Sequence, residues 1–192
     1  KTKSIFVHIP KCAGVSVAHN IYGHAVPHST ITDYQIMFGK DIFDSYFKFT
    51  IVRNPWSRLV SAYTFLKKGG FDKNDKLWAK HHIFPYKSFE SFVKNLPYNK
   101  ELLIWPHFIP QSKWILSPLN SSPLNHIGKL ENLSSELLYL SDKLNLLPIQ
   151  NKILNSTNNT KHYSEFYSEK TKQIVLDVYR KDIKLLGYKF EN

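Results

Sequence analysis

Residues 5–14 read Ile5-Phe6-Val7-His8-Ile9-Pro10-Lys11-Cys12-Ala13-Gly14. The run before the proline is mostly apolar, which predicts a short buried strand that stops at Pro10. After this stretch, apolar residues recur at helical spacing, and Gly23 is suited to close a helix. The sequence therefore predicts a strand over 5–9, a tight loop and a helix over 14–22.

The same order of elements recurs further along the chain. Residues 46–52 are rich in aromatic and β-branched residues, which predicts a second strand. Asn54 is a good capping residue directly before Pro55, so a helix is expected over 54–66. Strands that alternate with helices predict an α/β fold: one domain over 1–192, with a mostly parallel central sheet flanked by helices. The loops after the two strands should then meet at one edge of the sheet.

Other segments have weaker patterns. A short helix is expected from Asp33, as N-cap, to Phe38, before Gly39. Further helices are expected over 88–96 and 169–186, and a strand over 126–130. The apolar run at 114–116 is compatible with another strand.

The bulk properties restrict the class of protein. The chain has 192 residues, of which 42% are hydrophobic, enough for one globular core. No stretch approaches the roughly 20 apolar residues that span a bilayer, and no signal-peptide pattern is present. The formal charge of +11 predicts an anionic partner: nucleic acid, membrane surface, acidic polymer or phosphorylated small molecule. The single cysteine favours a reducing compartment, and several Asn-x-Ser/Thr tripeptides favour a secretory lumen.

The loop over 10–16 has the composition of an anion cradle. Its small residues let the backbone approach a ligand, and the following helix offers N–H groups and the positive end of its dipole. Lys11 adds a full charge. The loop is not a Walker A motif, because that pattern is absent and the lysine precedes the glycine. An ordinary strand-to-helix turn with a surface lysine is the alternative interpretation.

The loop after the second strand offers a second anion site. Arg53 leaves that strand beside a helix N-terminus, where its planar fork can bind a phosphate through two hydrogen bonds. Ser57 and Ser61 are four residues apart on one helix face, so a hydroxyl can join the contact. Two separate anion sites indicate a doubly anionic ligand.

Both loops resemble those of one enzyme family. Residues 6–14 look like the 5′-phosphosulfate loop of carbohydrate sulfotransferases, and residues 49–63 resemble their 3′-phosphate motif. Weaker similarity continues through 107–111, 128–133 and 179–190. The most similar members are the membrane-associated Golgi-type enzymes and their bacterial homologues. The resemblance implies a P-loop-NTPase-like sulfotransferase fold and the sulfuryl donor 3′-phosphoadenosine 5′-phosphosulfate (PAPS), with no metal.

The resemblance also implies roles for particular residues. Arg53 and Ser61 would bind the 3′-phosphate, and Lys11 would bind the 5′-phosphosulfate with the amides of Cys12, Ala13, Gly14, Val15 and Ser16. The product would be 3′-phosphoadenosine 5′-phosphate (PAP). The sequence departs from the family pattern at Cys12-Ala13, where many relatives have Thr-Gly or a similar pair. Alanine narrows the backbone conformations permitted at that position.

The reaction requires one general base. Sulfuryl transfer needs alignment of donor and nucleophile, neutralisation of the leaving phosphate and removal of the acceptor's proton. Relatives often place a histidine between the two donor motifs, and His28, before Ser29-Thr30, fits best. His24 and a glutamate stay as alternatives. Cysteine catalysis by Cys12 is not expected, because position 18 lacks the arginine that a phosphatase would have there. A metal site at His24 and His28 is not expected either, because a third ligand is missing.

The acceptor is less defined. Aromatic and histidine residues of the middle segment can stack on sugar rings or fill the core: Trp78, His81, His82, Phe84, Tyr86, Trp105, His107 and Trp114. A carbohydrate hydroxyl is the leading expectation. Two other functions compete, a P-loop-like nucleotide kinase and a basic nucleic-acid-binding module. The composition favours a cytoplasmic bacterial or viral enzyme, and a trimmed luminal domain of a Golgi-type enzyme is the alternative.

Overall fold

The computed structural model describes residues 2–119, 123–147 and 161–191. The chain divides into two compact units, each described below by itself. The first contains Lys1–Arg53 and Gln111–Ser156, and the second contains Asn54–Pro110 and Thr157–Asn192. In the described part of the chain, no helix is long and apolar enough to cross a membrane.

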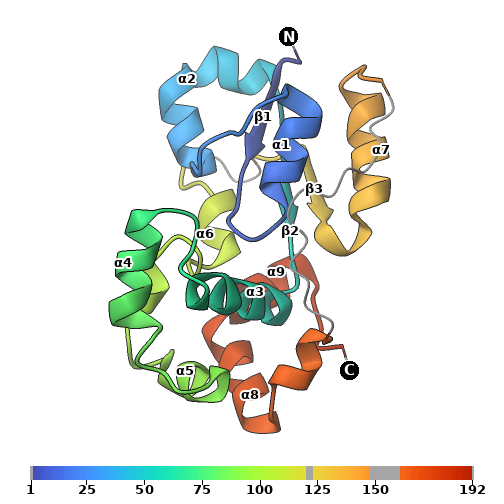
Figure 1. Ribbon diagram of the computed structural model, residues 1–192. Coiled ribbons are helices and arrows are strands. Elements are labelled where there is room, and N and C mark those ends of the chain that lie inside the picture. Colours follow the sequence, from blue (N-terminus) through green and yellow to red (C-terminus); the bar gives the residue numbers. More distant parts are fainter. Residues whose placement is uncertain (1, 120–122, 148–160, 192) are drawn as a thin grey trace. The chain divides into compact units, whose positions relative to one another are not determined.

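The first unit is built on a parallel sheet (Figure 1). Its strands are β1 (Ser4–Val7), β2 (Phe47–Val52) and β3 (His126–Lys129), in the order β1-β2-β3. Phe6 pairs with Phe49, and Phe49 pairs with His126. The predicted α/β class with a parallel sheet is therefore confirmed. Because all the strands are parallel, their carboxyl ends share one edge, where His8 and Arg53 follow β1 and β2.

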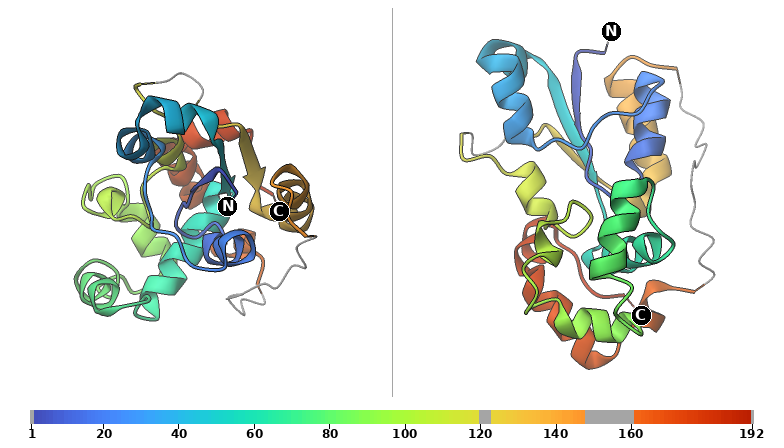
Figure 2. Two further views of the ribbon diagram at one scale, coloured as in Figure 1. Left: turned by 90° about the horizontal axis from the view of Figure 1, so that it is seen from above. Right: turned by 60° about the vertical axis from the view of Figure 1, so that its left-hand side comes forward.

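Helices cover both faces of this sheet (Figure 2). Helices α1 (Gly14–Tyr22) and α7 (Leu133–Lys143) lie on one side, and α2 (Ile31–Ser45) and α6 (Gln111–Ile115) on the other. Sheet residues Phe6, Phe49 and Ile51 point to the first side, as the two-residue period of strands requires. They pack against buried residues of the two helices, among them Val17, Ala18, Ile21, Leu133, Leu137 and Leu140.

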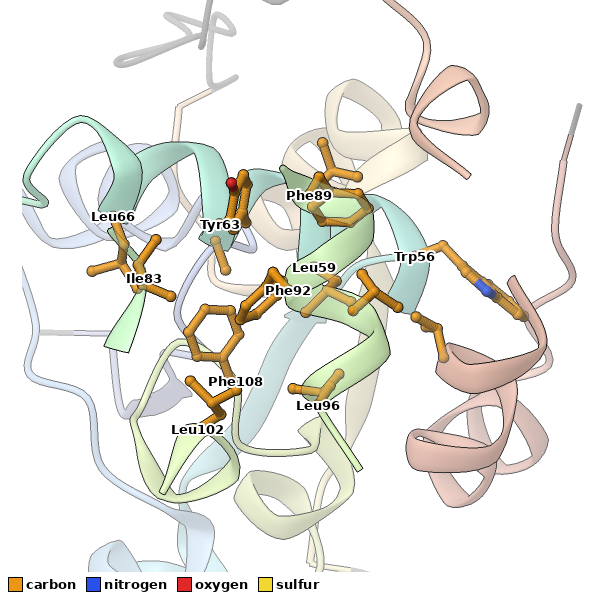
Figure 3. Packing of buried hydrophobic residues seen from close by; sticks show 14 of the residues in the cluster. Trp56, Leu59, Tyr63, Leu66, Ile83, Phe89, Phe92, Leu96, Leu102 and Phe108 are labelled. Carbon is orange, nitrogen blue, oxygen red and sulfur yellow. The ribbon is translucent and has the colours of Figure 1, made fainter. Parts of the chain in front are cut away.

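The second unit is helical. It contains α3 (Pro55–Lys67), α4 (Lys73–His82), α5 (Phe89–Asn95), α8 (Glu169–Val178) and α9 (Arg180–Leu186), with short 3₁₀ turns at Leu102–Ile104 and Tyr163–Phe166. Its core combines aliphatic side chains with several aromatic rings (Figure 3). Phe92 is fully buried and lies 5.0 Å from Tyr63 and 5.3 Å from Phe108, measured between ring centroids. Such tilted ring pairs add to the free energy gained from buried area alone.

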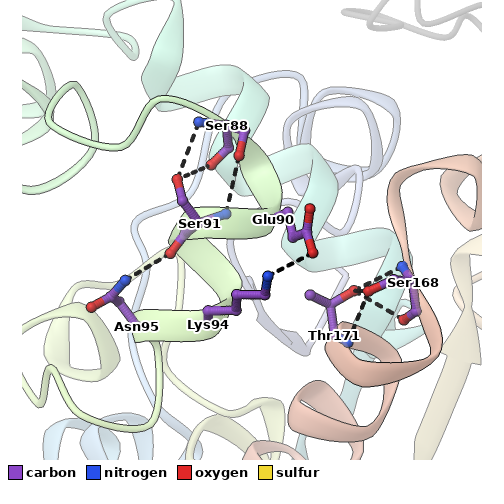
Figure 4. Close-up of polar contacts among 7 residues, drawn as sticks. All are labelled: Ser88, Glu90, Ser91, Lys94, Asn95, Ser168 and Thr171. Carbon is purple, nitrogen blue, oxygen red and sulfur yellow. Dashed lines mark hydrogen bonds and ion pairs between the residues drawn. The ribbon is translucent and has the colours of Figure 1, made fainter.

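Helix ends in this unit are capped by side chains (Figure 4). Ser88 caps α5 by accepting a hydrogen bond from the Ser91 amide, and the Ser91 hydroxyl accepts one from the Ser88 amide. Ser168 and Thr171 form the same reciprocal pair at the start of α8. These bonds satisfy amides that the helix itself leaves without partners, so the sequence sets where each helix begins.

Three sequence-based expectations need correction. The run at 114–116 belongs to α6 and the turn after it, because three apolar residues are too few to distinguish strand from helix. Helix α2 begins after Thr30, which shares a capping box with Asp33, and its regular geometry breaks at Gly39 before it resumes. The last helix is two helices, α8 and α9, separated at Tyr179. The single domain over 1–192 stays a prediction.

Candidate active site

The β1–α1 loop (residues 8–13) has an unusual backbone. Lys11 and Ala13 both adopt left-handed conformations, with φ of 69° and 56°. L-residues rarely adopt such angles, and strain of this kind concentrates at functional sites. Helix α1 begins directly afterwards, and within the described residues no side chain caps its N-terminus. Cys12 and Ser16 are buried here, whereas Val15 is exposed. The loop thus directs a lysine and a helix N-terminus to the carboxyl edge of the sheet.

Arg53 lies against this loop. Its Nη1 atom donates a hydrogen bond to the Lys11 carbonyl oxygen over 3.2 Å. Gln111, the first residue of α6, holds the backbone of Arg53 from both sides: its Oε1 accepts from the Arg53 amide over 2.9 Å, and its Nε2 donates to the Arg53 carbonyl over 2.8 Å. The Cys12 thiol lies 3.4 Å from the same Oε1 atom. One buried glutamine therefore joins the segments that carry the two cations.

His8 is the first residue of the β1–α1 loop, and its side chain is buried. The residue is 4% exposed, and its Nδ1 atom lies 2.9 Å from the Val26 carbonyl oxygen. A carbonyl oxygen only accepts, so Nδ1 carries the proton. The ring also lies on Gly14, where an added Cβ would come within 1.8 Å of His8 Cδ2. Position 14 therefore tolerates only glycine as long as His8 stays in place.

His28 lies beside His8. Their ring centroids are 4.0 Å apart, and His28 Nδ1 lies 2.8 Å from the His8 carbonyl oxygen. Because that oxygen accepts the hydrogen bond, Nδ1 of His28 is protonated and Nε2 is the basic nitrogen of the neutral ring. Trp114 of α6 is edge-on to His28, with 6.2 Å between ring centroids. Within the first unit, both ends of the β1–α1 loop are thus contacted: Arg53 bonds to Lys11, and His28 bonds to His8.

His24, the other candidate histidine, has a different environment. Like His28 it is exposed, but its Nδ1 atom lies 2.9 Å from the carbonyl oxygen of the adjacent Ala25, and its ring centroid is 6.2 Å from that of Tyr22. Its local contacts are thus with its own chain neighbours. The described residues include no cluster of three or more His, Cys, Asp or Glu side chains that could hold a metal ion.

Ser61 and most acceptor candidates lie in the second unit. Ser61 is buried in α3, which begins at the Asn54 cap. Trp78 is sandwiched between two rings, with centroid distances of 4.6 Å to His82 and 4.5 Å to Trp105. The remaining candidates are spread over this unit: Phe84 and His81 are exposed, Tyr86 packs edge-on against Phe92, and His107 lies 3.8 Å from Asp75. Several of these rings therefore build the core.

Two residues of the site carry roles that sequence reasoning did not assign. His8 is part of the quoted motif, yet its position in an apolar run gives no sign of its two hydrogen-bonded neighbours. Gln111 is far from both loops in the sequence, so no local spacing connects it with Arg53. Its one sequence signal is the weak family resemblance over 107–111.

The buried imidazole of His8 makes stability depend on pH. Burial, together with the charge of His28, lowers the pKa of His8 from 6.5 to about 4. The unfolded chain therefore takes up this proton first as the pH falls, and the free energy of unfolding should drop by about 3 kcal/mol at most between pH 6.5 and pH 4. Urea denaturation of the wild type and a His8→Asn variant checks this. Parallel pH curves for the two proteins would contradict it.

Comparison with known proteins agrees with this geometry. The chain matches, over residues 1–189, the sequence model of a family described as "Sulfotransferase family". It is 32% identical over 119 residues to an uncharacterized protein of Archaeoglobus fulgidus, a match that covers 56% of this chain and 75% of the archaeal protein. No solved structure matches the chain. Because the family match spans nearly the whole sequence, the chain belongs to the sulfotransferase family and is a sulfotransferase enzyme.

Proposed function

We propose that the enzyme uses PAPS as its donor and transfers the sulfuryl group to a hydroxyl, with His28 as general base. The observation that carries the proposal is the contact between the Arg53 guanidinium and the Lys11 carbonyl. It brings two cationic residues to the N-terminus of α1, at the edge where parallel sheets bind ligands. A bis-anionic nucleotide matches this arrangement: its 5′-phosphosulfate on Lys11 and the α1 amides, its 3′-phosphate on Arg53. Ser61 is the further 3′-phosphate ligand that the family resemblance implies.

The chemistry follows from these positions. The acceptor oxygen forms a bond to sulfur while the bond from sulfur to the 5′-phosphate oxygen breaks, in line. Lys11 and the α1 N-terminus stabilise the negative charge that develops on the leaving phosphate. The acceptor's proton passes to Nε2 of His28, the basic nitrogen of that ring. One bond to sulfur forms, one bond to sulfur breaks and one proton is transferred, so the products are PAP and the sulfated acceptor.

A carbohydrate hydroxyl is the acceptor that we propose. Trp114 supports this choice, because it is the candidate aromatic residue beside His28. Its indole nitrogen is buried and, among the described residues, has no hydrogen-bond partner. The charge of +11 suits a glycan that is already anionic. We also propose the cytoplasm as its compartment, because the single cysteine is a buried thiol.

Titration with PAP tests the donor. We expect saturable binding by calorimetry without Mg²⁺. Arg53→Ala should raise Kd roughly 10- to 150-fold, because hydrogen bonds to charged groups are worth roughly 1.5–3 kcal/mol. Arg180→Ala is the matched control, since Arg180 is exposed and pairs with Asp177.

Three results would overturn the donor assignment. One is the absence of PAP binding by the wild type, and another is a preference for ATP with Mg²⁺, which the kinase alternative predicts. The third is binding of PAP that Arg53→Ala leaves unchanged. Steeply salt-dependent binding of DNA or RNA in place of PAP would favour the nucleic-acid alternative.

A further inference from the structure

We propose that His8 is a positioning residue, which holds the α1–α2 loop (residues 23–30), and with it the base His28, against the β1–α1 loop. This inference rests on the proposed function, because it assigns His8 a part in keeping the base aligned with the donor. His8 itself touches no reacting atom. Three contacts of His8 support this inference: one is made by its Nδ1 atom, one by its backbone carbonyl and one by its ring atom Cδ2.

The first two contacts fasten the α1–α2 loop at two points. The side chain of His8 donates from Nδ1 to the Val26 carbonyl, and the backbone carbonyl of His8 accepts from Nδ1 of His28. Val26 and His28 are two residues apart, so both bonds act on one short segment of the loop. Since His8 directly follows β1, the segment is attached to the end of a central element of the fold.

The third contact joins the same residue to the start of α1. The His8 ring fills the space that a side chain at Gly14 would need. Gly14 is the first residue of α1, so the imidazole lies beneath the helix N-terminus that would bind the phosphosulfate. Movement of the α1–α2 loop relative to the donor site therefore breaks its two bonds to His8 or displaces His8 from the start of α1.

The chemical state of His8 suits this role. Desolvation keeps the buried ring neutral at ordinary pH, so it adds no positive charge beside His28 when that residue accepts a proton. The ring of His8 lies against that of His28 with 4.0 Å between centroids, which restricts the rotation of the base. A base that is already held in one orientation loses less conformational entropy when it aligns with the acceptor in each turnover.

Two variants separate the hydrogen bond from the bulk of the ring. In His8→Asn the side-chain amide nitrogen takes the place of Nδ1 and can still donate to Val26. In His8→Leu the side chain fills a similar volume but donates nothing. We expect kcat to fall roughly 10- to 100-fold in His8→Leu and to recover in large part in His8→Asn, with PAP affinity nearly unchanged in both. His19→Leu, an exposed residue of α1, is the control.

Nitrogen NMR of His28 gives a readout independent of turnover. A neutral histidine without constraint favours the Nε2–H tautomer, whereas the bond to the His8 carbonyl requires Nδ1–H. We expect the Nδ1–H tautomer in the wild type and in His8→Asn, and a mixture in His8→Leu. The same tautomer and kcat in all three proteins would overturn the positioning role. If the tautomer shifts as expected while no sulfotransfer activity is found even in the wild type, the proposed function fails, and His8 keeps only the role of holding the α1–α2 loop against the β1–α1 loop.

Discussion

Replacement of His28 by alanine is expected to abolish turnover while the enzyme still binds its donor. General bases typically contribute about 10²- to 10⁴-fold to a rate, so kcat should fall by that order. Nδ1 of His28 is engaged by the His8 carbonyl, which leaves Nε2 to take the acceptor's proton. Radiolabelled sulfuryl transfer from PAPS to a panel of glycans, lipids and small phenols measures turnover, and PAP calorimetry measures donor affinity.

A second variant, His24→Ala, tested in the same assays, shows whether His28 or His24 is the general base. His24 is bonded to its own neighbour Ala25, whereas His28 is bonded to His8, so we expect the larger loss in His28→Ala. A dead His24→Ala enzyme with an active His28→Ala enzyme would move the base to His24. Full activity in both variants would move it to a carboxylate. The same acceptor panel would show whether a sugar hydroxyl is the substrate.

Replacement of Arg58 by methionine is expected to destabilise the second unit by about 2–5 kcal/mol, because it leaves two buried carbonyl oxygens without their donor, at about 1–3 kcal/mol each. Arg58 is 3% exposed and donates to the carbonyls of Ile109 and Pro106. It also acts electrostatically on Tyr179, whose hydroxyl donates to the Phe108 carbonyl. The loop over 106–109 thus depends on this guanidinium. Urea denaturation followed by circular dichroism measures the loss.

Arg180→Met is the matched control for this substitution. Arg180 is exposed and pairs with Asp177 on the surface, where ion pairs contribute little to stability. An Arg58→Met protein as stable as Arg180→Met would show that the buried network does not support the unit. The comparison also separates the two arginines of the motif: Arg53 belongs to the candidate site, whereas Arg58 supports the second unit.

The parts of the fold that were predictable from sequence depend on local signals. Helix α1 has the predicted bounds, because its apolar spacing and the Gly23 cap lie within one segment. Helix α3 begins as predicted, because the Asn54 side chain accepts hydrogen bonds from the amides of Trp56 and Ser57. The shared edge of the sheet followed from the parallel arrangement, and it brings Arg53 to Lys11.

The remaining features depend on contacts between distant segments. Gln111 reaches Arg53 across 58 residues of sequence, and no periodicity encodes that bond. The role of His8 depends on where the α1–α2 loop lies, which a strand pattern cannot show. The apolar run at 114–116 is compatible with a strand, although tertiary packing places Trp114 on a helix of five residues. Propensity in so short a segment is readily overridden by packing.

The left-handed conformation of Ala13 has a consequence for the energetics of ligand capture. Alanine in this conformation carries strain that glycine would not, but it samples fewer shapes than glycine before any ligand arrives. The loop is ordered when the chain folds, so an incoming anion meets a backbone whose conformation is already set. The entropy lost when the loop becomes ordered is then a cost of folding and not of binding. Tight binding at this loop therefore comes at the expense of the stability of the first unit.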